Sequence, residues 1–314
     1  MDSNSKAEHI AKCLELAILL EASAHKPGNV SVVTNFESTH YEHFLASAVA
    51  TRPSFEYAAE RGIAALMGKI CLNDIGIGYT IKKCVADISA WQHGGNTLLG
   101  TIILVSPIAA AAGMTPAKDI YKIADLRENL KLVIESTTPE DAVNVYEAIK
   151  TANPSGLGKA PKLDVNDPES TNQILAEKTS LFEVFKIAEK YDTICSEWVN
   201  NYPVTFDLAY PHLTKQLGNK DDPNGAIIQV FLEVLVECPD TFIARKTSLE
   251  KAREISSKAR EILELGGLGT SRGKESLNNF DQQLRKASNL LNPGTTADII
   301  AAALSLCVLG GYRP

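Results

Sequence analysis

The chain has 314 residues, of which 45% are hydrophobic and 22% are charged, so it can bury a substantial core. A net charge of -7 argues against a nucleic acid or an anionic membrane as the main partner. The six cysteines are scattered and form no CxxC pair, which is typical of reduced core thiols in a cytoplasmic protein.

Helix signals dominate the chain, and runs with strand alternation are few. Taken in order, the periodicity of apolar residues predicts helices over 7–24, 42–50, 55–70, 78–91, 97–113, 119–135, 140–151, 173–200, 223–237 and 296–309. A further helix is predicted to open with the capping box Thr247-x-x-Glu250 and to close at Gly266-Gly267. We therefore expect an all-α protein, folded as a single compact multi-helix domain over residues 1–314.

Three segments could be taken for membrane spans or for a domain linker. The runs 98–113 and 299–311 are rich in Ala and Gly and short for a bilayer, so we expect buried core helices and no membrane span. A homodimer seam is the alternative use of these helices. Residues 152–172 are too rich in Pro, Gly and Asp for a core element, and we interpret them as a long polar loop of the active site rather than a domain linker.

The end of the first predicted helix places polar side chains where packing requires none. Glu21 continues the apolar face, and Pro27-Gly28 stops the helix, so Lys26 is held at a rigid turn. The plain explanation is a helix C-terminus whose lysine complements the helix dipole. The alternative is a functional site that contains Glu21 and Lys26.

Further polar clusters lie at other helix ends. They are His40 with Glu42; Gly94, Gly95, Asn96 and Thr97; Asp141 with Asn144; Asp164 with Asp167; Asp240 with Arg245 and Lys246; and the segment 292–298 with Gly294, Thr295 and Asp298. Taken singly, each has a structural explanation, such as an N-cap or a first-turn acid. No Walker A, GxSxG, HExxH or EF-hand pattern is present, which disfavours common hydrolase classes.

Two of these clusters share a physical logic for binding phosphate. The segments 94–97 and 292–298 each precede an apolar helix and offer free backbone N–H groups, glycines for close approach and hydroxyl donors. Carboxylates from several elements would then hold Mg²⁺, because this ion usually takes one or two carboxylates besides substrate phosphates. The sequence therefore indicates a site that uses ATP.

A series of motifs leads to a family. KPG at 26–28, GGNTxxG at 94–100, DT-x-x-x-R/K at 240–246, LGG at 265–267, FD at 280–281 and NPGTTAD at 292–298 occur in this order. On this series the chain resembles the triphosphoribosyl-dephospho-CoA synthase family, which makes the precursor of the citrate lyase prosthetic group. The resemblance extends over most of the chain and implies an all-α fold.

The resemblance also implies a reaction. The family joins the ribose C1 of ATP to the 2'-hydroxyl of 3'-dephospho-CoA and releases adenine with the triphosphate intact. Such chemistry needs a base, an acid for the departing adenine, negative charge beside an oxocarbenium-like ribose, and Mg²⁺ on the triphosphate. Small-molecule partners are thus expected, namely ATP and a CoA-like acceptor.

Residue roles follow from this chemistry as hypotheses. Glu21 and Asp141 are candidates for the base or the oxocarbenium stabiliser, and Lys26 is a candidate contact to the triphosphate. If so, Lys26→Ala should abolish turnover and leave thermal stability nearly unchanged. The candidate Mg²⁺ ligands are Asp164, Asp240 and Asp298. The candidate nucleotide and phosphate contacts are Gly28, His40, Gly95, Asn96, Thr97, Lys246, Gly294 and Thr295.

Departures from the family pattern bear on the substrate. Members that serve citrate lyase typically have KPGLVD and NTHKG, whereas this chain has KPGNVS and NTLLG, so Ser31 replaces an acid and Leu98-Leu99 replace His-Lys. Such charge-assisted contacts are worth roughly 1.5–3 kcal/mol each. The pattern resembles a divergent, archaeal-type branch, for which a different acceptor is one alternative and a helical nucleotide-binding protein without turnover is another.

Overall fold

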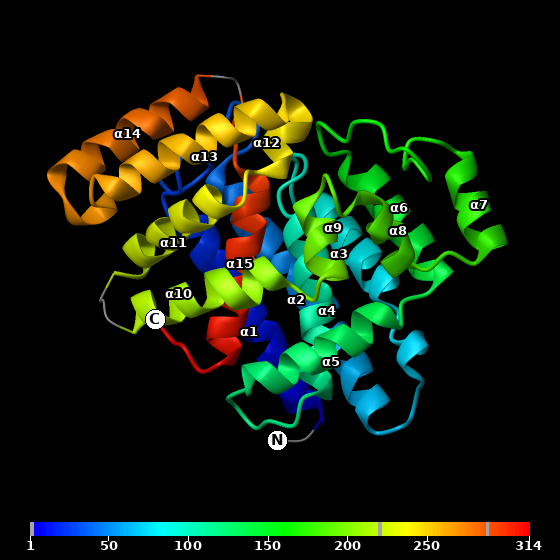
Figure 1. Cartoon of the computed structure of the whole chain (residues 1–314). Helices are drawn as coiled ribbons and strands as arrows, with labels where there is room; N and C mark the ends of the chain where they lie inside the picture. Colours follow the sequence, from blue (N-terminus) through cyan, green and yellow to red (C-terminus); the bar gives the residue numbers. More distant parts are fainter. Residues whose placement is uncertain (1–2, 219–221, 287–288) are drawn as a thin grey trace.

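The computed structural model describes residues 3–218, 222–286 and 289–314. Its α-helices are α1 (Ser3–Ser23), α2 (Tyr41–Leu66), α3 (Ile77–Trp91), α4 (Leu99–Met114), α5 (Ile123–Glu135), α6 (Pro139–Ala152), α7 (Glu169–Glu177), α8 (Leu181–Ala188), α9 (Thr193–Val199), α10 (Tyr210–Leu217), α11 (Pro223–Glu237), α12 (Thr241–Lys246), α13 (Leu249–Glu264), α14 (Ser271–Arg285) and α15 (Gly294–Leu309). Short turns of other helix types are η1 (Leu72–Asp74), η2 (Val204–Ala209) and η3 (Gly267–Gly269). Over these three ranges the only β-type pairing is one bridge between Ser31 and Thr34, so the all-α prediction is confirmed (Figure 1).

The centre of the molecule is built on α1, α4 and α15. Nearly every residue of α4 and α15 is buried, which agrees with their lack of a polar face. α2 packs on both α1 and α4, and α15 packs on both α1 and α4. The two Ala- and Gly-rich runs are therefore core helices, as predicted. No helix in the described part of the chain is long and apolar enough to cross a membrane.

Glycines allow the central helices to approach closely. A Cβ atom built on Gly62 of α2 would lie 2.0 Å from the carbonyl oxygen of Ala110 on α4. A Cβ on Gly113 of α4 would lie 2.2 Å from the carbonyl oxygen of Ala59 on α2. Backbone therefore packs directly on backbone at both points, and a side chain would force the helices apart.

Two predicted helix boundaries are wrong. Residues 41–66 form one helix with Pro53 inside it, not two. The carbonyl that loses its hydrogen bond belongs to Val49, a half-exposed residue, so water can replace the missing partner. Conversely, 173–200 is three helices, because Lys178 adopts a left-handed φ of 54° and Ser180 and Asp192 cap new helices.

Other local predictions also need correction. The N-cap of α13 is Ser248 and not Thr247, whose hydroxyl instead donates to the carbonyl of Ile243 in α12. The helices α10, α12 and α14 were not expected from apolar periodicity, since α10 and α12 are short and α14 is strongly polar. All six cysteines are free, but Cys71 is exposed and is not a core thiol.

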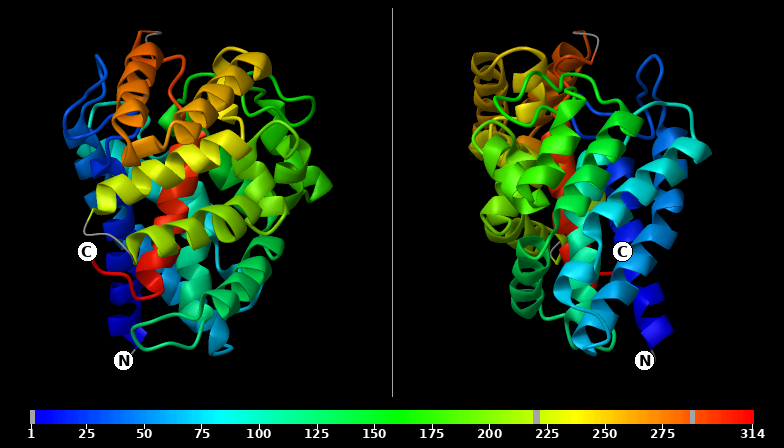
Figure 2. Two further views of the ribbon diagram at one scale, coloured as in Figure 1. Left: turned by 60° about the vertical axis from the view of Figure 1, so that its left-hand side comes forward. Right: turned by 90° about the vertical axis from the view of Figure 1, so that its right-hand side faces the viewer.

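The helix directions bring three helix ends together. α1 runs opposite to α4 and α15, so the C-terminal end of α1 meets the N-terminal ends of the other two beneath α12 and α13 (Figure 2). The N-terminus of the chain lies at the opposite end of the molecule (Figure 1). Polar groups at these three helix ends thus face one region, where core packing gives way to a cavity.

Candidate active site

A cavity of about 490 Å³ occupies this region. Its walls are the C-terminal end of α1 with the following turn, the segment 94–103, the loop 153–165, helices α8, α9 and α12, and the start of α15. The wall is polar where the three helix ends meet. The lining contributed by α6, the loop and α8 includes the apolar side chains of Ile149, Leu157, Val165, Val184 and Phe185.

Glu21 and Lys26 form a buried ion pair at the polar end. Lys26 Nζ lies 2.9 Å from Glu21 Oε1, donates to the Ala24 carbonyl at 3.0 Å and also donates to the carbonyl of Glu21. The Lys26 side chain is 1% exposed. All three ammonium hydrogens are therefore used within the protein, where they satisfy the last carbonyls of α1 and fix the Glu21 carboxylate.

Asp298 lies in the second turn of α15 and faces the start of α4. Thr101 Oγ1 donates to Asp298 Oδ1 at 2.6 Å. A Cβ on Gly100 would lie 2.1 Å from Asp298 Oδ2, so only glycine leaves room for this carboxylate. Burial, reinforced by the charges of Glu21 and Asp240, raises the pKa of Asp298 to about 8. A cation at this position would relieve the crowding of negative charge.

Asp240 connects α12 to α15. Its Oδ1 accepts the backbone N–H groups of Phe242 and Ile243 at the start of α12, and its Oδ2 accepts the N–H and hydroxyl of Thr296 at 2.7 and 2.8 Å. Burial raises the pKa of this carboxyl, and the bonds from Thr296 oppose the rise. Asp240 does not line the cavity, and its four donors give it the role of a helix cap and cross-link.

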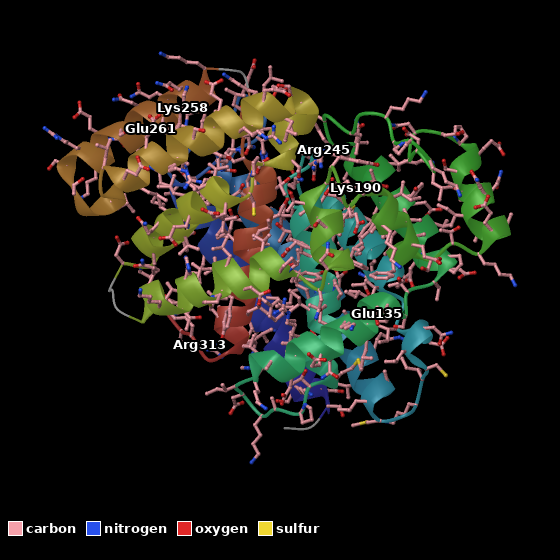
Figure 3. All side chains as sticks on the ribbon, in the orientation of Figure 1. Glu135, Lys190, Arg245, Lys258, Glu261 and Arg313 are labelled. Carbon is pink, nitrogen blue, oxygen red and sulfur yellow. The ribbon has the colours of Figure 1, made fainter. Side chains whose placement is uncertain are left out.

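Two cations of α12 line the cavity. Lys246 Nζ lies 3.7 Å from the centre of the Phe242 ring and donates to the Asn289 carbonyl at 2.9 Å. Burial lowers the pKa of Lys246 to about 8. Arg245 pairs with Asp192 through Nη1, while its Nε is buried and has no partner among the described residues. Figure 3 places Arg245 on the inner side of α12, facing the α6–α8 part of the molecule.

The structure brings eight of the fourteen predicted site residues together. Those that line the cavity are Glu21, Lys26, Asn96, Thr97, Lys246, Gly294, Thr295 and Asp298. Asn96 also accepts the N–H of Leu99 at 3.2 Å, and Thr97 pairs with Ser47 at 2.7 Å. Those that do not line it are Gly28, His40, Gly95, Asp141, Asp164 and Asp240.

Asp141 lies outside the cavity and has a structural role in capping α6. It is the third residue of α6 and completes a capping box with Thr138, whose N–H donates to Asp141 Oδ2 at 2.9 Å. Its Oδ1 accepts the N–H of Gly78 at 2.7 Å, which joins α6 to α3. Burial raises the pKa of this carboxyl. The position gives no support to a role for Asp141 as the catalytic base.

The remaining residues outside the cavity shape nearby turns. Asp164 accepts the N–H groups of Ala160 and Asn166 at 2.7 and 2.8 Å, and these bonds hold the loop 153–165. The bond from Asn166 is the main reason that the pKa of Asp164 is lowered. His40 is exposed and caps α2, while the carbonyl of Gly95 accepts from Gln92 at 2.8 Å.

The residues that depart from the family pattern are also placed. Leu98 and Leu99 are buried and line both the main cavity and a second one of about 250 Å³ beneath α3 and α6. Ser31 is fully buried and pairs with the Thr34 hydroxyl at 2.9 Å. The chain therefore has an apolar wall where family members have His-Lys.

Thr101, Arg245 and Tyr191 line the cavity but were not among the predicted site residues. Arg245 lies within the 240–246 motif, so its spacing was an available signal. Thr101 directly follows the GGNTxxG motif. Tyr191 gave no signal in the sequence, because a tyrosine inside the predicted helix 173–200 has many structural uses.

Comparison with known proteins identifies the class. The family model of ATP:dephospho-CoA triphosphoribosyl transferases matches residues 7–313. The chain therefore belongs to this family of transferases, which confirms the resemblance seen in its motifs.

Individual relatives are similar over shorter stretches. A protein of Pseudomonas savastanoi pv. phaseolicola, named a probable 2-(5''-triphosphoribosyl)-3'-dephosphocoenzyme-A synthase, is 27% identical over 103 residues, or 33% of this chain and 35% of that protein. A protein of Klebsiella pneumoniae, named 2-(5''-triphosphoribosyl)-3'-dephosphocoenzyme-A synthase, is 29% identical over 93 residues, or 30% of each chain. The matches thus span about a third of the length of these curated relatives.

A solved structure is similar over most of the chain. It comes from Archaeoglobus fulgidus and is provisionally named a triphosphoribosyl-dephospho-CoA synthase. The TM-score is 0.61 at 22% identity, over 86% of this chain and 100% of the other. The likeness supports the all-α fold.

Proposed function

We propose that the protein transfers the 5-triphosphoribosyl group of ATP to the 2'-hydroxyl of 3'-dephospho-CoA and releases adenine. One observation carries this proposal: Glu21 and Asp298 line a single cavity that also contains the N-termini of α4 and α15 and apolar side chains of the loop 153–165 and α8. Membership of the transferase family supports the same reaction.

The reaction breaks the bond between ribose C1 and adenine and forms a bond between C1 and the acceptor oxygen. The hydroxyl proton goes to a base of the protein, and adenine leaves with a proton. No phosphoryl group moves, so a P-loop is not required. The transition state carries positive charge on the ribose, which a fixed carboxylate stabilises. Glu21 suits both needs, because Lys26 fixes one of its oxygens at the cavity wall.

Mg²⁺ fits the residues at one point of the site. Among the described residues no group of three His, Cys, Asp or Glu side chains is arranged to hold a metal. We therefore do not propose a Mg²⁺ site made of protein ligands alone. Asp298 is a partly buried carboxylate that lines the cavity and accepts a hydrogen bond from Thr101. Asp240, by contrast, is occupied by four donors, and Asp164 lies in the loop. Asp298 would therefore hold Mg²⁺ together with substrate phosphates. When bound, the ion neutralises the triphosphate.

The triphosphate is assigned to the start of α15. Gly294 and Thr295 line the cavity there, and the first N–H groups of a helix attract anions. The N–H of Gly294 donates to the Asn292 carbonyl and that of Thr296 donates to Asp240, so the N–H of Thr295 is the donor left for a phosphate among these three. Lys246 of α12 lines the same cavity, with its ammonium against the Phe242 ring. Lys26 is not assigned to this role, because its three hydrogens are already bound within the protein.

A different acceptor is the second candidate. Leu98 and Leu99 remove two charges from the wall between the two cavities, and a CoA-type phosphate would find no cation there. This observation favours an acceptor whose contact with that wall is uncharged. A nucleotide-binding protein without turnover is less favoured, because the carboxylates of Glu21 and Asp298 would only repel a polyanion.

Adenine release tests the proposal. The purified protein is incubated with Mg-ATP, with and without dephospho-CoA, and adenine and nucleotide products are followed by chromatography with mass detection. Adenine that appears only with dephospho-CoA, together with the coupled product, is the expected result. Glu21→Gln is the inactive control. Bound ATP without adenine in either case would contradict the proposed acceptor and direct the search to other cofactor precursors.

A further inference from the structure

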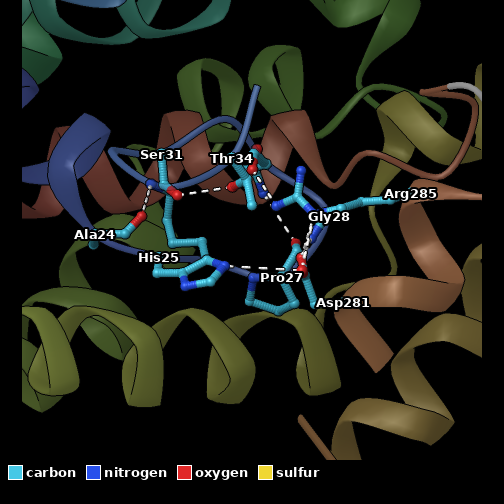
Figure 4. Close-up of polar contacts among 10 residues, drawn as sticks. Ala24, His25, Pro27, Gly28, Ser31, Thr34, Asp281 and Arg285 are labelled. Atoms are coloured by element: carbon cyan, nitrogen blue, oxygen red, sulfur yellow. Dashed lines mark hydrogen bonds and ion pairs between the residues drawn. The ribbon is translucent and has the colours of Figure 1, made fainter. Parts of the chain in front are cut away.

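A pair of residues on α14 binds the turn that follows α1 (Figure 4). Asp281 Oδ1 accepts the backbone N–H of Gly28 at 2.8 Å. Arg285 Nε donates to both oxygens of Asp281 at 2.9 and 2.8 Å, and Arg285 Nη2 donates to the carbonyl of Asn29 at 2.6 Å. We call Asp281 and Arg285 the α14 clamp. It holds the two residues that follow Pro27 and lies outside the cavity lining.

The clamp acts on a backbone with little freedom of its own. Gly28 has a φ of 74°, and a Cβ there would lie 2.8 Å from Leu284 Cδ1, so both its conformation and its contact with α14 require glycine. The N–H of Asn29 donates to the carbonyl of Lys26 at 3.2 Å. A shift of Gly28 therefore reaches Lys26 through one proline and one turn hydrogen bond.

Lys26 is the residue that fixes Glu21. It reaches back over the end of α1, and its ammonium has only one geometry that serves two carbonyls and a carboxylate at once. Among the described residues, Lys26 is the one polar partner of the Glu21 carboxylate. The place of the carboxylate thus depends on the place of the turn.

We propose that Asp281 and Arg285 are positioning residues for the reaction: they hold Gly28 and Asn29 so that Lys26 sets the Glu21 carboxylate at the cavity. This inference rests on the proposed function, in which Glu21 acts on the ribose and the acceptor hydroxyl. The bond from Gly28 to Asp281 joins residues 253 positions apart and connects an outer helix, packed mainly on α13 and η3, to the catalytic end of α1.

Steady-state kinetics tests the clamp. Asp281→Ala removes the acceptor of the Gly28 N–H, and a misplacement of about 1 Å near the reacting atoms can cost on the order of 100-fold in rate. We expect kcat to fall by about that factor while KM for ATP stays nearly constant, because the triphosphate is bound at α15. Asp281→Asn should lose less, since an amide oxygen can still accept from Gly28.

A matched control separates position from stability. Leu277→Ala empties a buried site on the same helix without touching the turn, so it should lower the melting temperature and leave kcat unchanged. A loss of kcat in Leu277→Ala equal to that in Asp281→Ala would overturn the inference. So would a fully active Asp281→Ala protein.

Amide hydrogen exchange gives a readout that does not depend on turnover. In Asp281→Ala, exchange over residues 24–34 should be faster by at least about tenfold, while α4 and α15 stay protected. If the wild-type protein releases no adenine, the proposed function fails, and exchange alone decides on the clamp. Unchanged exchange at Gly28 would then show that the turn does not depend on Asp281.

Discussion

Lys26 and Lys246 both reach the cavity wall, but their surroundings differ. The ammonium of Lys26 is enclosed by Glu21 and two carbonyls of α1, whereas that of Lys246 lies against the Phe242 ring and has one carbonyl partner, Asn289. Lys26 therefore organises the protein, and Lys246 has donors left for a ligand. Residue type alone does not distinguish these uses.

The burial of Lys26 changes the expected outcome of its removal. We predict that Lys26→Met loses turnover and also about 3–5 kcal/mol of the free energy of unfolding, because Glu21 is left as a buried charge without a partner. The simple expectation of unchanged thermal stability no longer holds. Urea denaturation measures the loss.

A second variant checks the cause. Adding Glu21→Gln to Lys26→Met removes the unpaired charge, so the double variant should be more stable than Lys26→Met and equally inactive. If Lys26→Met alone keeps the stability of the wild type, the ammonium is not needed by Glu21. Lys26 would then return to the role of a triphosphate ligand.

At the scale of the element, α4 uses glycine for two purposes. Gly100 leaves room for the carboxylate of Asp298, which is the end of a side chain. Gly113 leaves room for the carbonyl of Ala59, which belongs to the backbone of α2. A side chain can move aside, but a packed helix cannot. A change from glycine to alanine should therefore mainly reduce turnover at Gly100 and mainly reduce stability at Gly113.

This contrast gives a matched pair of variants. Gly100→Ala should displace Asp298 and reduce turnover at least tenfold, with a loss of stability below about 1 kcal/mol. Gly113→Ala should lower the free energy of unfolding by about 1–3 kcal/mol and leave the turnover of the folded protein unchanged. Kinetics and denaturation of both proteins decide. Equal kinetic losses in the two variants would argue against a site at Asp298.

The loop 153–165 is the second element with a specific expectation. We predict that its apolar side chains bind the pantetheine arm of the acceptor, because Leu157 and Val165 line the same cavity as the carboxylates. Leu157→Asp should raise KM for dephospho-CoA roughly tenfold, which corresponds to about 1.4 kcal/mol of lost binding. KM for ATP should not change.

ADP is the comparator, because it has the same ribose and diphosphate as dephospho-CoA but no pantetheine. Leu157→Asp should leave KM for ADP as acceptor unchanged. Leu175→Asp on α7 is the matched protein control, since that leucine is 45% exposed and lies outside the cavity. An equal rise in KM for ADP and dephospho-CoA would place the pantetheine elsewhere.

For the molecule as a whole, apolar periodicity predicted most of the long helices, because their burial follows from sequence alone. It missed α14, which is polar, and the breaks at Lys178 and Asp192, which no Gly or Pro marks. Pro53 had the reverse effect: it led to a prediction of two helices, whereas α2 continues through it because that face of the helix is half-exposed.

The site was predictable only where polar residues interrupt a buried pattern. Glu21 and Asp298, which line the candidate cavity, were singled out in this way. Asp141 and Asp240 have the same residue type, but their partners Gly78 and Thr296 are distant in sequence, so only the fold shows that they are cross-links. The spacing Thr138-x-x-Asp141 was an available sign of a capping box.

A buried carboxylate outside these motifs joins the end of α9 to the start of η2. Glu197 of α9 is 0% exposed, and its two oxygens accept the N–H groups of Val204 and Thr205 at 2.8 Å each, at the start of η2. The same stretch is anchored on α4, because Trp198 donates to the carbonyl of Ile103 at 3.1 Å. Burial raises the pKa of Glu197 to about 7, although both N–H bonds oppose the rise.

The raised pKa of Glu197 makes the stability of the fold depend on pH. Between the ordinary carboxyl pKa and about 7, the folded protein binds a proton that the unfolded chain has lost, so the contribution of Glu197 is full below this window and declines as pH rises through it. Glu197→Gln cannot titrate. The difference in unfolding free energy between wild type and Glu197→Gln should therefore be larger at pH 5 than at pH 8, by at most about 3 kcal/mol. Urea denaturation of the two proteins at the two pH values measures this difference, and every other titrating group is common to both proteins. An equal difference at pH 5 and pH 8 would mean that Glu197 is ionised at both values and that the η2 donors outweigh its burial.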